Sequence, residues 1–222
     1  MLIVFDFDGT LVDSIHDLTE AANDLSAAYG GPRHDETAVT FMVGEGARVL
    51  VARIMEQAGH PETPAGAYER FLQMYDRRML DTTAPYPGTI DMLAVLERSH
   101  RLAMLTNKPE AATRRIMSYT GLDRHFQDCV FGDGEWPRKP DPAGLRSLME
   151  KNGATEATTI LVGDSDVDLA TARAAGVQVC LTRYGFGFRR ISPSLIRPGD
   201  MVIDGPADLL DVLAAGSRIT QG

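Results

Sequence analysis

The sequence predicts an α/β protein with a doubly wound, Rossmann-like parallel sheet and an inserted α-helical cap domain. From residue 86 onward, apolar strand-like runs alternate with amphipathic helical segments, which is typical of a parallel sheet with helical crossovers. Residues 14–82 carry only helical spacing, although an apolar strand-like run precedes them. We therefore predict a core of residues 1–13 and 83–222 and a helical insert of residues 14–82.

The first element, residues 2–5, is a run of branched and aromatic side chains that indicates a buried strand. A helix is predicted next, beginning at Ser14, because Ser14 and Asp17 have the spacing of a capping box. The apolar face of this helix consists of Ile15, Leu18, Ala22, Leu25 and Tyr29. The Gly-Gly-Pro stretch at 30–32 ends it.

The other predicted elements follow from apolar periodicity and from glycine or proline between them. The insert continues with helices at 37–43, 47–58 and 67–80. The core alternates helices at 89–99, 110–119, 142–152, 167–175 and 207–214 with strands at 102–106, 129–131, 159–162, 177–181 and 201–203. Residues 183–199, which contain several glycines and prolines, are predicted to form a long loop.

Composition narrows the class of protein. The 222 residues are 44% hydrophobic, which is enough for a substantial core, and the formal net charge of −9 opposes binding to nucleic acid or to an anionic membrane. The arginine doublets at 77–78, 114–115 and 189–190 are isolated and are predicted to lie on solvated faces. Cys129 and Cys180 lie in strand-like runs and are interpreted as reduced core residues. With no segment apolar enough to span a bilayer, we predict a cytoplasmic protein.

Two aspartates, Asp6 and Asp8, directly follow the first predicted strand. Like charges at this spacing recruit a cation, and carboxylate oxygens suit Mg²⁺. Asp can also form a covalent phosphoryl intermediate, and a second Asp can transfer the protons. A calcium loop is the alternative for such a stretch, but Leu11 and Val12 stand where further oxygen ligands would be needed.

Three further polar clusters follow later predicted strands. Thr106 and Asn107 follow one strand, Lys139 lies in the loop after the next, and Asp164 and Asp168 follow a third. Each alone has a common structural interpretation as a helix cap or a solvated side chain. Because ligands bind at the carboxyl ends of parallel strands, their combination indicates Mg²⁺-assisted phosphoryl transfer.

In this order the motifs VFDFDGTLVDS, LTN, the Lys139-Pro140 loop and GDSDVDL resemble those of the haloacid dehalogenase-like phosphohydrolase superfamily. The resemblance covers nearly the whole chain and implies an Asp6 nucleophile and an Asp8 general acid and base. Asp8 points to the phosphatase branch rather than to the dehalogenases, which attack carbon without a metal.

The resemblance also implies the ligands of the metal and of the phosphoryl group. Mg²⁺ would be held by Asp6, the backbone carbonyl of Asp8 and Asp164, with Asp168 supporting the metal waters or Lys139. Thr106, Asn107 and Lys139 would bind the phosphoryl group. The helical insert would be the superfamily's cap, which closes over the site.

Residues 43–50, VGEGARVL, are similar to the VGxGAxxL cap segment of phosphoglycolate phosphatases. This resemblance implies a small phosphorylated metabolite as substrate, 2-phosphoglycolate above others, with Gly44, Gly46 and Arg48 binding its carboxylate. A sugar-phosphate, nucleotide or pyrophosphate phosphatase, a phosphomutase and a non-catalytic binding protein stay open as alternatives. A phosphonatase is disfavoured because no lysine occurs in the cap. The oligomeric state is open between monomer and homodimer.

Overall fold

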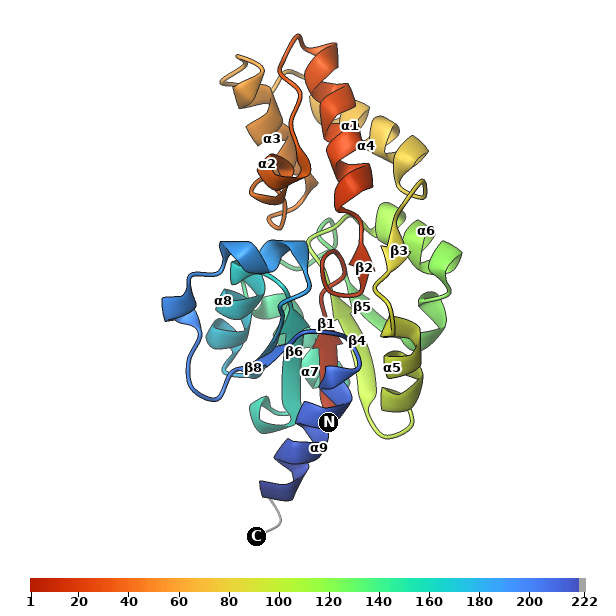
Figure 1. Ribbon diagram of the computed structural model, residues 1–222, viewed down its shortest axis with the longest axis vertical. Coiled ribbons are helices and arrows are strands. Elements are labelled where there is room, and N and C mark those ends of the chain that lie inside the picture. Colours follow the sequence, from red (N-terminus) through yellow and green to blue (C-terminus); the bar gives the residue numbers. More distant parts are fainter. Residues whose placement is uncertain (220–222) are drawn as a thin grey trace.

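A six-stranded parallel sheet forms the centre of the computed structural model, which describes residues 1–219 and their side chains through residue 215 (Figure 1). In sheet order the strands are β5 (Asp128–Val130), β4 (Arg101–Leu105), β1 (Leu2–Phe5), β6 (Thr159–Gly163), β7 (Gln178–Thr182) and β8 (Met201–Ile203). Every neighbouring pair is parallel. The predicted parallel sheet is confirmed, with β1 between β4 and β6.

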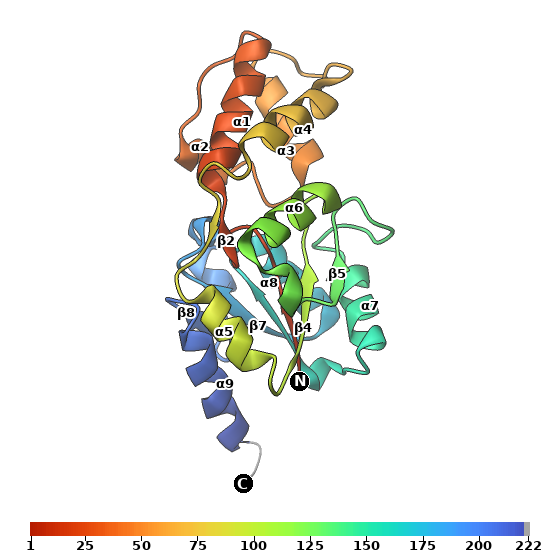
Figure 2. The same ribbon diagram turned by 90° about the vertical axis from the view of Figure 1, so that its right-hand side faces the viewer.

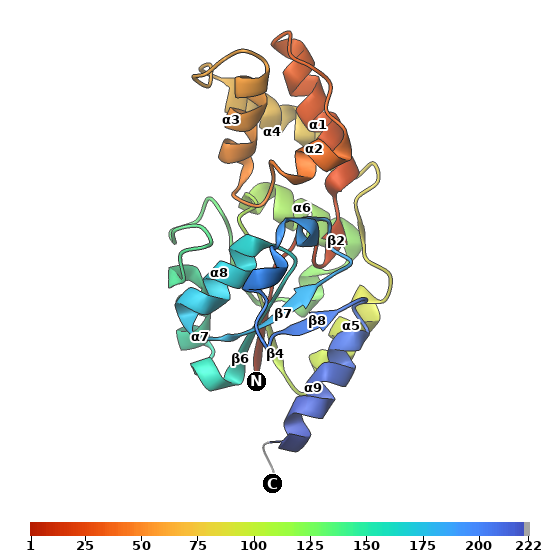
Figure 3. The same ribbon diagram turned by 60° about the vertical axis from the view of Figure 1, so that its left-hand side comes forward.

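Helices cover both faces of this sheet, as Figures 2 and 3 show. One face carries α5 (Thr89–Leu96), α6 (Glu110–Thr120) and α9 (Asp208–Ile219), and the other carries α7 (Ala143–Lys151) and α8 (Asp166–Ala175). Successive residues of a strand point to opposite faces. Accordingly, Ile3 and Phe5 of β1 belong to one buried apolar cluster, and Leu2 and Val4 belong to the other.

Four helices make up residues 14–82, without a strand anywhere in that range. They are α1 (Ile15–Ala28), α2 (Glu36–Thr40), α3 (Ala47–Gln57) and α4 (Ala67–Arg78). They lie together beyond the carboxyl ends of the sheet strands, whereas the N-terminus and α9 (Asp208–Ile219) lie at the opposite end of the core (Figure 1). Fully buried side chains such as Leu25, Ile54 and Phe71 pack these helices against one another.

Two short strands connect the helical insert to the core, and neither was predicted from the sequence. They are β2 (Val12–Asp13) and β3 (Ala84–Pro85), which pair antiparallel. Next to them, the buried Asp17 accepts hydrogen bonds from the backbone N–H and hydroxyl groups of Thr82 and Thr83. These bonds tie the beginning of α1 to the segment that returns to the core.

The predicted capping box at Ser14 and Asp17 is therefore wrong. Ser14 occupies the N-cap position of α1, but its side chain caps no backbone group. Its hydroxyl instead donates to Oδ1 of Asp8 at 2.5 Å. The four donors on Thr82 and Thr83 satisfy the Asp17 carboxylate more fully than one backbone N–H at the helix start could.

The predicted long loop at 183–199 contains two short 3₁₀ helices, η3 (Phe186–Arg190) and η4 (Pro193–Leu195). Two more, η1 (Asp123–His125) and η2 (Glu156–Thr158), lie in other connections. Cys129 and Cys180 are free thiols in β5 and β7; Cys180 is buried in the core as predicted, whereas Cys129 is half-buried against it. Among residues 1–219, no helix combines the length and the apolar character needed to cross a bilayer.

Candidate active site

The acidic site lies at the carboxyl ends of the three strands at the middle of the sheet. Asp6 follows β1, Thr106 follows β4 and Asp164 follows β6. Because these strands are parallel neighbours, the residues that follow them meet at one edge. Side chains 158 positions apart in the chain, on Asp6 and Asp164, thereby become neighbours.

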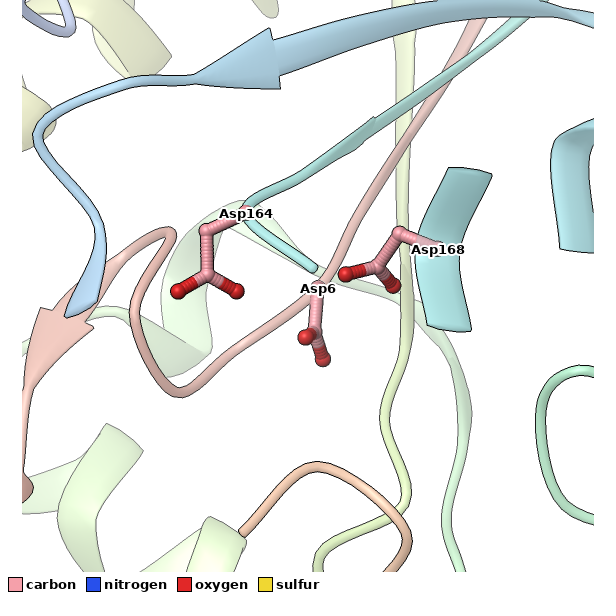
Figure 4. Close-up of side chains that lie close together, drawn as sticks. All are labelled: Asp6, Asp164 and Asp168. Atoms are coloured by element: carbon pink, nitrogen blue, oxygen red, sulfur yellow. The ribbon is translucent and has the colours of Figure 1, made fainter. Parts of the chain in front are cut away.

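Three buried carboxylates and one lysine form the centre of the site. Asp6, Asp164 and Asp168 each place a carboxylate oxygen within 4.8 Å of the others (Figure 4). The Nζ atom of Lys139 lies 2.8 Å from Oδ1 of Asp6 and 2.6 Å from Oδ1 of Asp168. The structure thus brings together four residues that the motifs predicted to cooperate.

Local structure fixes Asp168. Ser165 is the N-cap of α8, and its hydroxyl donates to Oδ2 of Asp168 and accepts from the backbone N–H of Asp168. The backbone N–H of Ser165 also donates to Asp168. This capping box explains the polar residues at the start of α8, and it leaves Oδ1 of Asp168 directed to Lys139.

Glycines surround Asp164. The backbone N–H of Gly187 donates to Oδ2 of Asp164 at 2.7 Å. A Cβ atom on Gly9 would lie 1.9 Å from Oδ2 of Asp164, and one on Gly185 would lie 2.3 Å from its Cβ atom. Only residues without a side chain let these two segments approach the carboxylate so closely.

Burial and mutual repulsion shape the protonation of the cluster. Burial raises the pKa of Asp6 to about 7, with Lys139 opposing the shift and Asp168 adding to it. Burial, then the charges of Asp168 and Asp6, raise the pKa of Asp164 well above its ordinary value. Burial disfavours the charged form of Lys139, yet Asp168 and Asp6 hold its pKa above the ordinary range. One ammonium therefore faces three carboxylates, which leaves negative charge uncompensated. The carboxylates offer only oxygen ligands, and such a set fits a divalent cation such as Mg²⁺.

The side chain of Asp8 points to different partners. Its Oδ1 accepts from the hydroxyl of Ser14 at 2.5 Å and from Nζ of Lys108 at 2.8 Å. The buried Lys108 also donates to the hydroxyl of Tyr75 on α4, at 2.7 Å. No role was predicted for Lys108 from the sequence, although its position two residues after Thr106 in the same loop was the signal available.

The two polar residues after β4 are placed differently. Thr106 is buried beside the site, and its Oγ1 accepts from the backbone N–H of Lys108 at 3.2 Å. The side-chain amide of Asn107 donates to the carbonyl oxygens of Gly44 and Lys139 and accepts from the backbone N–H of Lys139. Asn107 thus joins the insert to the Lys139 loop.

A cavity with a volume of about 70 Å³ lies between the strand ends and the helical insert. One buried water molecule needs about 10–15 Å³, so the space suits a small molecule. The core lines it with Asp6, Asp8, Thr106, Asn107, Lys108 and Asp164, among others. The insert contributes mainly apolar side chains such as Leu50, Phe71 and Leu72, together with Gly44, Gly46 and Tyr75.

The positions of Arg48 and Arg190 differ from those predicted from the sequence. Arg48 is outside the cavity lining, and its guanidinium carbon lies 3.9 Å from the centre of the Tyr68 ring. Arg190, predicted to be solvated, lines the cavity, donates to the carbonyl oxygen of Val43 and pairs with Asp166 at 3.1 Å. No local pattern reveals this role, because it depends on how residues 183–199 fold back over the sheet edge.

The sequence of this chain is similar to those of known phosphatases. Residues 3–182 match the family model described as haloacid dehalogenase-like hydrolase. The phosphoglycolate phosphatase of Rhodospirillum rubrum is 42% identical over 83% of this chain and 80% of its own length. Phosphoglycolate phosphatase 1 of Pseudomonas aeruginosa is 38% identical over 94% of this chain and 78% of its own length.

A solved structure shows the same arrangement of elements. The crystal structure of a predicted phosphoglycolate phosphatase from Haemophilus somnus superposes with a TM-score of 0.86 at 30% identity. The alignment covers 96% of this chain and 97% of that one. The chain therefore belongs to the haloacid dehalogenase-like hydrolase family, as one of its phosphatases.

Proposed function

We propose that this protein is a Mg²⁺-dependent phosphomonoester hydrolase that cleaves 2-phosphoglycolate to glycolate and phosphate through an aspartyl phosphate. The observation that carries the proposal is the position of Asp6. This residue lies at the end of the central strand, contacts Lys139 and lines the cavity. The small cavity volume and the names of the relatives support the choice of substrate.

In the first step, Asp6 attacks phosphorus while Asp8 protonates the leaving oxygen. Lys139 holds the Asp6 carboxylate in place and offsets its repulsion from the phosphate. Thr106 and the backbone of Asn107, which both line the cavity, would bind phosphoryl oxygens. When bound by Asp6, Asp164 and the backbone carbonyl of Asp8, with support from Asp168, Mg²⁺ would neutralise charge on the transferring group.

In the second step, Asp8 accepts a proton from water that attacks the aspartyl phosphate, and Asp6 is released. Asp8 lines the cavity, where both the leaving group and the water would enter. Its two neighbours, Ser14 and Lys108, hold the carboxylate in one orientation between the two steps. Asp8 thus serves as acid and then as base without changing its place.

Residues 14–82 would act as the cap over this site. The contacts of the insert with the core around the cavity include those of Gly44 with Asn107, Tyr75 with Lys108 and Val43 with Arg190. With these contacts made, the cap covers the cavity and limits the access of water to the phosphoenzyme. Gly44 and Gly46 line the cavity and would bind the substrate through backbone groups, whereas Arg48 packs on Tyr68.

The test is phosphate release with Mg²⁺ from a panel of esters that contains 2-phosphoglycolate, sugar phosphates, nucleotides, pyrophosphate and an aryl phosphate. We expect kcat/KM for 2-phosphoglycolate to exceed the others clearly. Comparable values for sugar phosphates or nucleotides would reject this substrate but keep the reaction. Isomerised product without free phosphate would replace hydrolysis by a mutase reaction.

A further inference from the structure

We propose that Lys108, together with the hydroxyl of Tyr75, binds the carboxylate of the substrate. This inference rests on the proposed function and assigns a role that the sequence motifs give to Arg48. A carboxylate that enters a closed cavity needs a cation or several hydrogen-bond donors there. Among the described residues that line the cavity, the cations are Lys108 and Arg190.

The location of Lys108 fits the leaving-group end of the substrate. Its Nζ atom lies 2.8 Å from Oδ1 and 3.1 Å from Oδ2 of Asp8, the residue proposed to protonate the leaving oxygen. In 2-phosphoglycolate the carboxylate carbon is only two bonds from that oxygen. A group in contact with Asp8 is therefore within reach of the carboxylate while the phosphoryl group faces Asp6.

Tyr75 supplies a second donor from the insert. Its hydroxyl oxygen accepts from Lys108 at 2.7 Å, and a tyrosine hydroxyl also has one proton to donate. No acceptor for that proton occurs among the side chains described through residue 215 or the backbone described through residue 219, and Tyr75 lines the cavity. The ring is fixed by stacking on Phe71, with ring centres 6.0 Å apart. A carboxylate beside Lys108 would thus be held from the core and from the cap at once.

Arg190 is tied to the cap. Its guanidinium donates to the carbonyl oxygen of Val43 and pairs with the carboxylate of Asp166. Lys108 also pairs with a protein carboxylate, but its partner Asp8 lines the cavity, whereas Asp166 does not. The backbone contact of Arg190 fixes the cap segment next to Gly44. Arg190 therefore positions the cap, and its loss should affect substrates with and without a carboxylate alike.

The experiment compares 2-phosphoglycolate with ethyl phosphate, which has a methyl group where the carboxylate stands. In the Lys108→Met variant, we expect kcat/KM for 2-phosphoglycolate to fall about 100-fold, as for a lost charge-assisted hydrogen bond in a closed site. The fall for ethyl phosphate should be much smaller and reflect only the contact with Asp8. Tyr75→Phe, which keeps the ring, should lower the ratio between the two substrates about tenfold.

Arg190→Met is the matched control, because it removes the other cation of the cavity. We expect it to lower kcat/KM for both esters by the same factor. Binding is measured separately by calorimetry in the Asp6→Asn background, where adding Lys108→Met should remove the preference for 2-phosphoglycolate over ethyl phosphate. This readout does not depend on turnover.

Wild-type protein tests the proposed substrate, and the variants test Lys108. If wild-type protein does not prefer 2-phosphoglycolate over ethyl phosphate, the substrate is wrong and the inference is overturned with it. If wild-type protein has the preference but Lys108→Met lowers kcat/KM for both esters equally, the proposed substrate is retained and the role of Lys108 is rejected. A preference lost only in Arg190→Met would assign the carboxylate to Arg190 instead.

Discussion

The Nζ atom of Lys139 lies 2.8 Å from Oδ1 of Asp6, at the end of the central strand. The lysine comes from a loop more than a hundred residues away in the sequence, and its side chain is 2% exposed. A buried ammonium in this position would offset the repulsion between Asp6, the proposed nucleophile, and an anionic phosphate. The first prediction concerns its removal.

Lys139→Met should lower kcat at least about 100-fold, because it removes a preorganised cation from the site where negative charge gathers. Steady-state phosphate release measures this effect. Lys151→Met is the control: Lys151 is exposed and pairs with Asp128 on the surface, so its loss should leave the rate unchanged. A near-normal rate for the Lys139→Met enzyme would show that Lys139 does not contribute to the reaction.

Gly185→Ala should disrupt the surroundings of Asp164. Gly185 has a φ angle of −69°, so the backbone tolerates alanine, but a Cβ atom there would lie 2.2 Å from the carbonyl oxygen of Gly9. We expect a loss of about 1–3 kcal/mol in the free energy of unfolding, as for overpacking, together with a fall in activity. Gly205→Ala, whose Cβ would meet only Asp208 at 3.9 Å, should change neither quantity. Equal behaviour of the two variants would contradict this account of the close approach.

Asp17→Asn should destabilise the junction between insert and core. Burial acts to raise the pKa of Asp17, but hydrogen bonds from Thr82 and Thr83 outweigh it and hold this pKa below its ordinary value. The carboxylate therefore stabilises the fold above the pKa of the unfolded chain, about 3.9, and loses this contribution as the pH falls through the lower folded pKa.

We expect Asp17→Asn to cost about 1–3 kcal/mol of unfolding free energy at pH 7, as measured by urea denaturation. The difference from wild type should shrink as the pH falls below about 4. Asp24→Asn is the control, because Asp24 forms a half-exposed pair with Arg78 and should cost at most about 1 kcal/mol. A difference for Asp17→Asn that is independent of pH would exclude the charged carboxylate as its source.

Stabilisation by Mg²⁺ should increase with pH. Without a cation, the pKa of Asp6 is raised to about 7, so between the unfolded value and 7 the folded protein holds a proton that the unfolded chain has lost. This proton stabilises the metal-free fold at low pH, and a cation must displace it. The Mg²⁺-induced rise in Tm should therefore be small at pH 5 and larger at pH 8.

Thermal melting with Mg²⁺ or with a chelator measures this shift. Asp6→Asn is informative beside it, because an asparagine holds no displaceable proton, and the dependence on pH should weaken. An identical Mg²⁺ effect at pH 5 and pH 8 in the wild-type protein would show that the cation does not bind at the Asp6 cluster.

Periodicity predicted most of the fold because it reflects burial directly. Residues 2–5 contribute alternate side chains to both faces of the sheet, and all residues of this strand are buried. The site was also predictable in outline, since parallel strands must bring Asp6, Thr106 and Asp164 to one edge. Neither conclusion needed knowledge of a distant contact.

Features that depend on long-range partners were not predictable. Asp17 has the spacing of a capping box but accepts its hydrogen bonds from Thr82 and Thr83, which are 65 and 66 residues away. Arg48 and Arg190 look alike in the sequence, yet the folding of the loop after β7 puts only Arg190 at the cavity. Local spacing indicates which residues could take part in the chemistry, but tertiary contacts determine which of them lie at the site.

In the proposed reaction, Asp6 forms a covalent bond to phosphorus. The direct measurement is acid quenching during turnover, followed by borohydride reduction of any acyl phosphate and mass spectrometry of the peptides that contain Asp6, Asp8 and Asp164. We expect reduction at Asp6 in the wild-type protein and none in Asp6→Asn. Phosphate release without any modified aspartate, or modification at Asp8 or Asp164 instead, would contradict the assignment of Asp6 as nucleophile.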